Sequence, residues 1–190
     1  MGVWQRIHEP LCHAVRTQAA RHPDPSAAMM DSQSIKTTEE SGVIKGYDGG
    51  EQVKGRERHV LVDTLGLRLS ASVTPAKTSD QEGARRLLAG LKPLQPRLEL
   101  IWADGAYKGD GLARWCATEG EWRLEIITRA QQAQGFVVRP WCWIVERTLA
   151  WIGRQRRLSK DYERKVQTSE TFMMLAMIRL MVARVAKRAR

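Results

Sequence analysis

The sequence predicts an α/β fold in which a five-stranded sheet is flanked by helices. Short apolar runs of strand length end in an acid or a glycine turn, and one of them, 67–74, alternates strictly between apolar and polar residues. Longer segments repeat apolar residues at helical intervals of three and four. With 190 residues, of which 43% are hydrophobic, the chain has the size and apolar content of one compact domain.

The first half of the chain carries clear signals for one helix and three strands. The expected elements are a helix over 4–21, a linker over 22–26, a buried strand over 27–30, a loop or flexible hairpin over 38–58, and paired strands over 60–63 and 67–74. The two prolines of the linker end the first helix, because proline excludes helix at its own position and before it. The first strand ends in Asp31, and the turn containing Gly66 makes the last two strands an antiparallel hairpin.

The second half alternates helices with strands. The expected elements are helices over 80–91 and 110–120, strands over 98–103 and 124–127, and two final helices over 141–157 and 169–188. Ser79 and Glu82 form a capping-box pattern at the start of the first of these helices. Asp104 follows the strand 98–103 directly. We expect the helix and linker, 1–25, to precede a main domain over 26–190.

The charge of the chain favours a polyanionic partner. Lys and Arg number 31 against 21 Asp and Glu, a formal net charge of +10, which suits nucleic acid. A membrane surface would attract the same charge, but the longest apolar run near the C-terminus, 172–178, is far shorter than the roughly 20 residues that cross a bilayer. The chain is therefore expected to have no membrane span.

Cysteine usage and the N-terminus indicate a reduced, cytoplasmic protein. Cys12, Cys116 and Cys142 are odd in number and widely spaced, and the four histidines do not join them at zinc-ligand spacing. The N-terminus lacks the continuous apolar segment of a secretory signal. We therefore expect neither disulfides nor structural zinc.

Three acids are candidate metal ligands. Asp31 and Asp104 each follow an apolar strand, and neighbouring strands in one sheet bring their ends together. Glu146 borders the apolar stripe of the helix 141–157. Three carboxylates suit Mg²⁺ or Mn²⁺, and two such ions together promote in-line displacement at phosphorus.

Each acid also has a plain structural interpretation. A lone Asp after a strand commonly forms a turn or caps a helix, and Glu146 next to Arg147 reads equally well as a solvated helix pair. Asp63 and Asp80 compete as acids at element boundaries. We interpret Asp63 as a turn residue and Asp80 as an acid of a first helical turn, and expect both to lie outside the cluster.

Three long motifs resemble the DDE transposases of the IS-five group of bacterial insertion sequences. They are DSQSIKTTEESGVIKGYDGGEQVKGRERHVLVDTLGL (31–67), IWADGAYKG (101–109) and WIVERTLAWIGRQRRLSKDYE (143–163). The resemblance implies an RNase H-like fold with a mixed sheet. It places the catalytic, metal-binding acids at Asp31, Asp104 and Glu146, with two Mg²⁺ or Mn²⁺ ions. The implied activity is strand cleavage by water followed by attack of the freed 3′-hydroxyl on target DNA.

The chain departs from that pattern in two places. The wider superfamily has Tyr, Arg and a basic residue at the positions that hold Arg139, Cys142 and Gly153 here. The first catalytic acid also comes only thirty residues into the chain, where relatives carry a longer DNA-binding region. An alternative is therefore a catalytically inactive, truncated remnant that binds DNA without specificity. An unrelated RNA-binding protein is a third possibility, but no RNP-type aromatic motif or Gly-X-X-Gly clamp is evident.

Basic residues along the chain are candidate DNA contacts. Between 139 and 165 eight basic residues face three acids, although a solvated helix face would look the same. The candidates are Lys36, Lys54, Arg56, Arg58, Lys108, Arg147, Arg154, Arg157 and Lys160. The expected partner is double-stranded DNA, both transposon ends and target, bound by a homodimer and possibly together with a separate N-terminal DNA-binding product.

Overall fold

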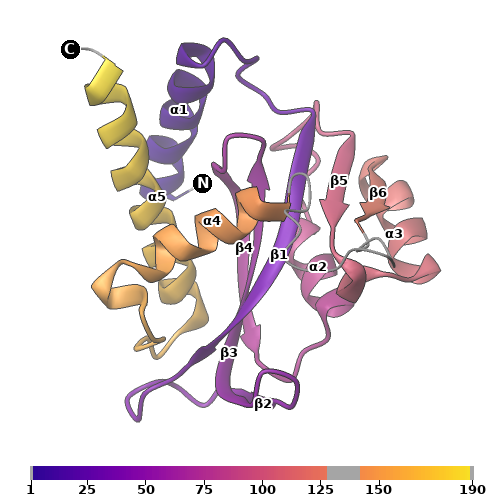
Figure 1. Cartoon of the computed structure of the whole chain (residues 1–190), viewed down its shortest axis with the longest axis vertical. Helices are drawn as coiled ribbons and strands as arrows, with labels where there is room; N and C mark the ends of the chain where they lie inside the picture. Colours follow the sequence, from indigo (N-terminus) through magenta and orange to yellow (C-terminus); the bar gives the residue numbers. More distant parts are fainter. Residues whose placement is uncertain (1, 128–141, 189–190) are drawn as a thin grey trace, which may run out of the picture.

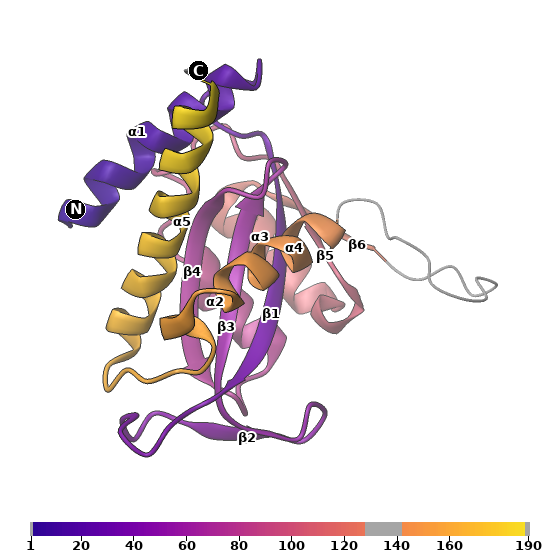
Figure 2. The same cartoon turned by 60° about the vertical axis from the view of Figure 1, so that its left-hand side comes forward.

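A twisted six-stranded sheet lies between two layers of helices in the computed structural model, which describes residues 2–127 and 142–188. The helices α4 and α5 cover one face of the sheet, and α2 and α3 lie on the other (Figures 1 and 2). The helices are α1 (Val3–Gln18), α2 (Asp80–Leu88), α3 (Asp110–Gly120), α4 (Cys142–Gly153) and α5 (Val166–Arg188). The strands are β1 (Ala27–Lys36), β2 (Gly46–Asp48), β3 (Val53–Asp63), β4 (Arg68–Pro75), β5 (Leu100–Ala103) and β6 (Arg123–Ile126). Two 3-10 turns, η1 (Gly105–Tyr107) and η2 (Arg156–Leu158), complete the described elements.

The sheet is mixed, as the sequence motifs predicted. Its strands lie in the order β4, β3, β1, β5, β6. The pairs β4–β3 and β3–β1 are antiparallel, whereas β1–β5 and β5–β6 are parallel. The short β2 pairs with the start of β3 and continues the edge that β4 occupies, because Gly55 pairs with Gly46 and the next residue, Arg56, pairs with Pro75. The prediction of five strands is correct apart from this three-residue addition.

The segment 38–58 is more regular than its composition indicated. Glycine and charge favoured a loop, yet β1 runs on to Lys36 and β3 begins at Val53. From Gly55 onward every residue of β3 is buried, including five charged or polar ones. Because β3 is central and covered on both faces, its polar residues find partners inside the molecule, and a pattern based on hydrophobicity could not detect it.

Alternate residues of the central strands pack into two separate cores. Ala28 and Met30 of β1 belong to a cluster with residues of α2 and α3, while Met29 between them packs with α4 and α5. This alternation follows from strand geometry, in which successive side chains point to opposite faces. It also fixes the face of the sheet on which each polar residue of β1 lies.

The N-terminal helix packs onto the C-terminal one. Cys12 and Val15 of α1 form a third apolar cluster with Met177 and Met181 of α5, and the two helices lie side by side in both ribbon views (Figures 1 and 2). Asp63 is buried here: it forms an ion pair with Arg16 and accepts backbone hydrogen bonds within the turn that follows β3. Within the described ranges, the helices are all too short or too polar to cross a membrane.

Candidate active site

Asp31 and Asp104 occupy matching positions on neighbouring parallel strands. Met29 of β1 pairs with Trp102 of β5, and two residues further along each strand stand Asp31 and Asp104. Adjacent strands lie about 4.8 Å apart, so this register brings the two side chains together. The backbone of Asp104 is extended, with φ −83° and ψ −176°, and therefore continues the direction of β5. Side-chain alternation places both acids on the face of Met29 and Trp102, which α4 covers.

Glu146 approaches the same face from α4. Val145, Leu149 and Ile152 are buried against the sheet, which confirms the apolar stripe predicted for this helix. Glu146 is exposed at the edge of that stripe. Figure 1 shows α4 crossing over β1, the strand that carries Asp31. The helix thereby supplies a third carboxylate from outside the sheet.

The carboxyl group of Asp31 is hard to ionise. Burial raises its pKa to about 7, and the negative charges of Asp104, Glu146 and Asp80 act in the same direction. A hydrogen bond from the backbone N–H of Ser32, 2.9 Å long, opposes the shift only in part. A carboxylate that is buried among other carboxylates is stabilised by a cation, so this environment favours metal binding.

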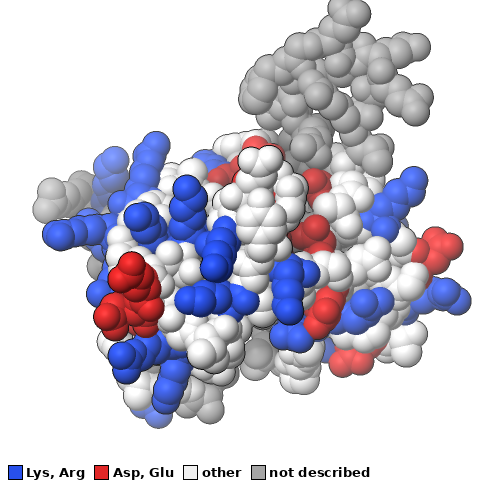
Figure 3. All heavy atoms as spheres, turned by 90° about the horizontal axis from the view of Figure 1, so that it is seen from below, with Lys and Arg blue, Asp and Glu red and all other residues white. Residues whose placement is uncertain are grey.

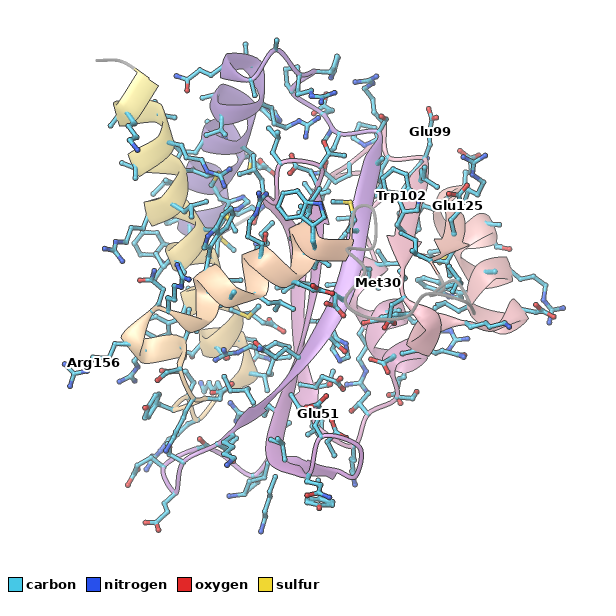
Figure 4. All side chains as sticks on the ribbon, in the orientation of Figure 1. Met30, Glu51, Glu99, Trp102, Glu125 and Arg156 are labelled. Atoms are coloured by element: carbon cyan, nitrogen blue, oxygen red, sulfur yellow. The ribbon has the colours of Figure 1, made fainter. Side chains whose placement is uncertain are left out.

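A polar pocket of about 420 Å³ opens beside Asp31 and Asp104. Its lining residues are Asp31, Ser32, Gln33, Ser34, Asp48, Glu51, Glu57, Asp80, Asp104, Ala106 and Tyr107. Six of them are acids and none is Lys or Arg. Glu51, one of the lining residues, lies on the turn between β2 and β3 (Figure 4). Carboxylate and hydroxyl oxygens are the ligands of hard divalent cations, and this donor set fits such ions.

Asp80 lies close to the predicted acids, on the α2 side of the sheet. Asp80 begins α2, as predicted, but its carboxylate accepts a 2.7 Å hydrogen bond from the hydroxyl of Ser32 and lines the pocket. Ser32 follows Asp31 directly in β1, so this hydrogen bond connects the first residue of α2 to the neighbour of Asp31. Asp63, in contrast, is a turn residue paired with Arg16 and contributes nothing to the pocket.

Two of the predicted DNA contacts are wrong. The side chains of Arg56 and Arg58 are buried with 0% exposure. Arg56 pairs with Asp161 at 3.0 Å, and Arg58 donates to the carbonyl oxygen of Leu158 at 2.7 Å. A guanidinium enclosed in this way cannot reach a phosphate. Both arginines instead attach the segment after α4 to β3.

Most of the other predicted contacts are on the surface. The exposed ones are Lys36, Lys54, Lys108, Arg154, Arg157 and Lys160. Figure 3 shows Lys and Arg spread widely over the lower face of the molecule, with acids gathered in smaller groups. Arg156 points away from the sheet into solvent (Figure 4). Arg147 is half-buried and stacks on the rings of Trp143 and Trp151, at 4.3 and 4.6 Å from their centroids.

The departures noted in the sequence lie largely outside the described residues. Arg139 belongs to the segment 128–141, and the side chain of Cys142 is likewise not described. Gly153 ends α4, and a Cβ atom built there would meet no atom within 4 Å. The backbone at this position therefore leaves space for a Cβ atom.

The mixed sheet between two helical layers agrees with the RNase H-like fold that the sequence motifs predicted, and an acidic pocket opens beside it. The family of transposase DDE domains matches residues 22–181, and the chain belongs to that family. Members of the family use divalent metal ions, in agreement with the acidic pocket. The matched range includes Asp31, Asp104 and Glu146.

A curated relative carries a similar description. The chain is 26% identical over 129 residues to a protein of Burkholderia cepacia described as "Putative transposase for insertion sequence element IS402". The match covers 64% of this chain and 60% of that relative, so the chain spans about three fifths of the relative's length. Membership of the IS-five group itself stays a prediction.

Solved structures with related folds include viral and transposon enzymes. The catalytic core domain of BIV integrase matches with a TM-score of 0.47 and 15% identity, covering 80% of this chain and 81% of that one. The catalytic domain of Mos1 mariner transposase matches with a TM-score of 0.45 and 10% identity, covering 97% and 90%.

Proposed function

We propose that this chain cuts DNA strands and joins the freed 3′-hydroxyl ends to target DNA, using divalent ions held by Asp31, Asp104 and Glu146. One observation carries the proposal: Asp31 and Asp104 each follow by two residues the parallel pair of Met29 and Trp102, which lies on the face that α4 covers. The charge of Glu146 reaches Asp31 from α4. These two observations support a site to which β1, the end of β5 and α4 each contribute one acid.

Two displacements at phosphorus make up the reaction. In the first, a water oxygen attacks a phosphodiester, the bond to the 3′ oxygen breaks, and the cut strands end in a 3′-hydroxyl and a 5′-phosphate. In the second, that 3′-hydroxyl attacks a target phosphodiester and releases a new 3′-hydroxyl there. Mg²⁺ or Mn²⁺, two ions in our proposal, would stabilise the charge on the attacking and leaving oxygens. The role of the three carboxylates is to hold the ions and to align the substrate phosphate.

Double-stranded DNA is the partner that the surface supports. The charged residues that line the pocket are all acids, so a phosphate group would approach it with cations bound. Exposed lysines and arginines outside the pocket, among them Lys108 after β5 and Arg154 after α4, can hold the flanking backbone. A homodimer on DNA and an accompanying N-terminal DNA-binding product remain predictions.

The test is a cleavage and joining assay with the purified chain. A supercoiled plasmid is incubated with Mg²⁺ or Mn²⁺ and a labelled duplex that carries a free 3′-hydroxyl, and nicked and joined products are separated on a gel. Asp104→Asn should remove both products, because it deletes one ligand and leaves the fold unchanged. Asp110→Asn, an exposed acid six residues later, is the matched control and should retain them.

Three outcomes would decide the matter. Equal activity of the Asp104→Asn and unsubstituted chains would refute the assignment of the site. Nicking that persists after chelation of all metal would refute the chemistry. Salt-sensitive DNA binding without cleavage in either ion would instead support the inactive remnant, for which the cysteine at position 142 is the motivating sequence feature.

A further inference from the structure

A second group of metal-ligand side chains lies on the opposite face of the sheet from α4. Glu57 and His59 are two residues apart on β3, so both point toward α2, and Asp80 is the first residue of that helix. Among the residues that the structure describes, these three are the one set of His, Cys, Asp and Glu whose ligand atoms all lie within 4.8 Å of one another. Glu57 and Asp80 also line the acidic pocket, which gives an ion a route from solvent.

The ring of His59 is held in a fixed position. The side chain is fully buried, and a Cβ built on Gly83 of α2 would lie 2.1 Å from its Cε1 atom, so the ring rests against the helix backbone. Its Nε2 atom is 2.9 Å from the hydroxyl of Thr74 and 3.7 Å from Glu57 Oε2. Burial lowers the pKa of His59 to about 4, so the imidazole is neutral and has a lone pair for a metal at physiological pH.

Two buried polar atoms at this place have no protein partner. Within the described ranges, neither His59 Nδ1 nor the hydroxyl of Tyr107 forms a hydrogen bond, although Tyr107 is 1% exposed. Tyr107 lines the same pocket, and burial raises the pKa of its hydroxyl, with the charges of Asp80, Asp31 and Glu57 acting in the same direction. Buried polar atoms are almost always paired, so two such atoms beside three ligand groups point to a bound species.

We propose that Glu57, His59 and Asp80 form a further divalent-metal site, distinct from the Asp31, Asp104 and Glu146 site and joined to it through Ser32. One imidazole nitrogen and two carboxylates favour a transition metal, Mn²⁺ or Zn²⁺, over Mg²⁺, which takes oxygen ligands. The hydroxyl of Ser32, which donates to Asp80, and that of Tyr107 are placed to bind water on the ion. Such an ion would tie β3 to the start of α2 and offset negative charge beside Asp31.

The decisive measurement is whether an ion is bound through nitrogen. In the full chain carrying Asp31→Asn and Asp104→Asn, Mn²⁺ binding is counted by electron paramagnetic resonance, and coupling to ¹⁴N is read by electron spin echo modulation. We expect one Mn²⁺ per chain with imidazole coupling, and coupling should disappear in His59→Gln. Zn²⁺ titration by calorimetry forms the second arm and identifies the preferred metal. Because two of the three carboxylates proposed for catalysis are replaced, failure here would be distinct from failure of strand transfer.

Isosteric variants then test the carboxylates. Glu57→Gln and Asp80→Asn should each weaken binding at least about tenfold, since even the loss of an outer partner of a ligand costs that much. Glu82→Gln is the matched control. Glu82 lies two residues after Asp80 on α2 and pairs with Arg86, so its replacement should leave the metal affinity unchanged. Circular dichroism checks the fold of each variant. Absence of bound Mn²⁺ and Zn²⁺ at millimolar concentration, an ion without nitrogen coupling, or equal affinity in Glu57→Gln would each overturn the proposal.

Discussion

Replacing Arg56 tests whether this arginine stabilises the fold or contacts DNA. Its guanidinium makes four hydrogen bonds: from Nε to the Ile44 carbonyl at 2.8 Å, from Nη1 to Asp161 Oδ1 at 3.0 Å and the Glu163 carbonyl at 2.7 Å, and from Nη2 to the Arg164 carbonyl at 3.1 Å. Arg56→Met would leave three carbonyl groups and a buried carboxylate without their donor.

The expected cost is large. Removing one partner of a buried ion pair costs about 3–5 kcal/mol, a large part of the roughly 5–15 kcal/mol that stabilises a typical domain. At a slope of about 2 kcal/mol per molar urea, the unfolding midpoint should fall by about 2 M. The carboxylate of Asp161 retains Ser169 and the N–H of Glu163, which keeps the loss from being larger.

Urea unfolding followed by fluorescence of the tryptophans measures this loss. The double variant Arg56→Met/Asp161→Leu should regain part of the stability, because no charge is then left buried alone. Lys54→Met is the matched control: Lys54 is exposed two residues earlier on β3, so stability should hold while DNA affinity falls slightly. If the Arg56→Met chain unfolds at the same urea concentration as the unsubstituted chain but binds DNA more weakly, the structural role is refuted. Arg56 would then be a DNA contact, as the sequence predicted.

Three further predictions address the pocket, the DNA surface and the packing of α2. The first uses the Glu57→Gln variant, in which the further metal site is weakened, to measure Mn²⁺ binding at the site of Asp31. The Mn²⁺ affinity should fall about tenfold between pH 8 and pH 6, because the pKa of Asp31 is raised to about 7 and protons compete with the ion. Calorimetry that shows a constant affinity over this pH range would contradict the prediction. DNA binding by the chain should be modest and fall steeply between 50 and about 200 mM salt in a fluorescence titration, with slight sequence preference; tight, sequence-specific binding would contradict it. Gly83→Ala should destabilise the fold by about 1–3 kcal/mol, since its Cβ would meet the ring of His59. Gly111→Ala, in α3 with its nearest contact at 3.7 Å, should stabilise by up to about 1 kcal/mol, and similar melting temperatures for the two variants would argue against the close contact.

Local patterns predicted most of the secondary structure. The helix over 80–91 is observed as Asp80–Leu88, with Ser79 accepting the hydrogen bond of the capping box from the N–H of Glu82. The strand over 98–103 is observed as Leu100–Ala103 and ends at Asp104, as predicted. These signals act within a few residues of one another, which is why sequence alone detects them.

Charged residues inside β3 were the main source of error. Arg56, Glu57 and Arg58 were assigned to a loop or flexible hairpin, yet all three are buried. Arg56 and Arg58 bind residues that lie far away along the chain, Asp161 and Leu158. A single side chain gives no sign of such a partner, because its burial depends on contacts that only the folded chain creates.

The sequence by itself determined the α/β class, the order of helices and strands, the two aspartates that follow apolar strands, and the likeness to DDE transposases. Only the tertiary structure decided which polar residues meet. The strand register places Asp31 near Asp104, and the packing of α2 places Asp80 within hydrogen-bond distance of Ser32. The arginines of β3 are buried between the layers of helices. The physical reason is that periodicity records the face on which a residue lies, whereas the meeting of two distant residues depends on how whole elements pack.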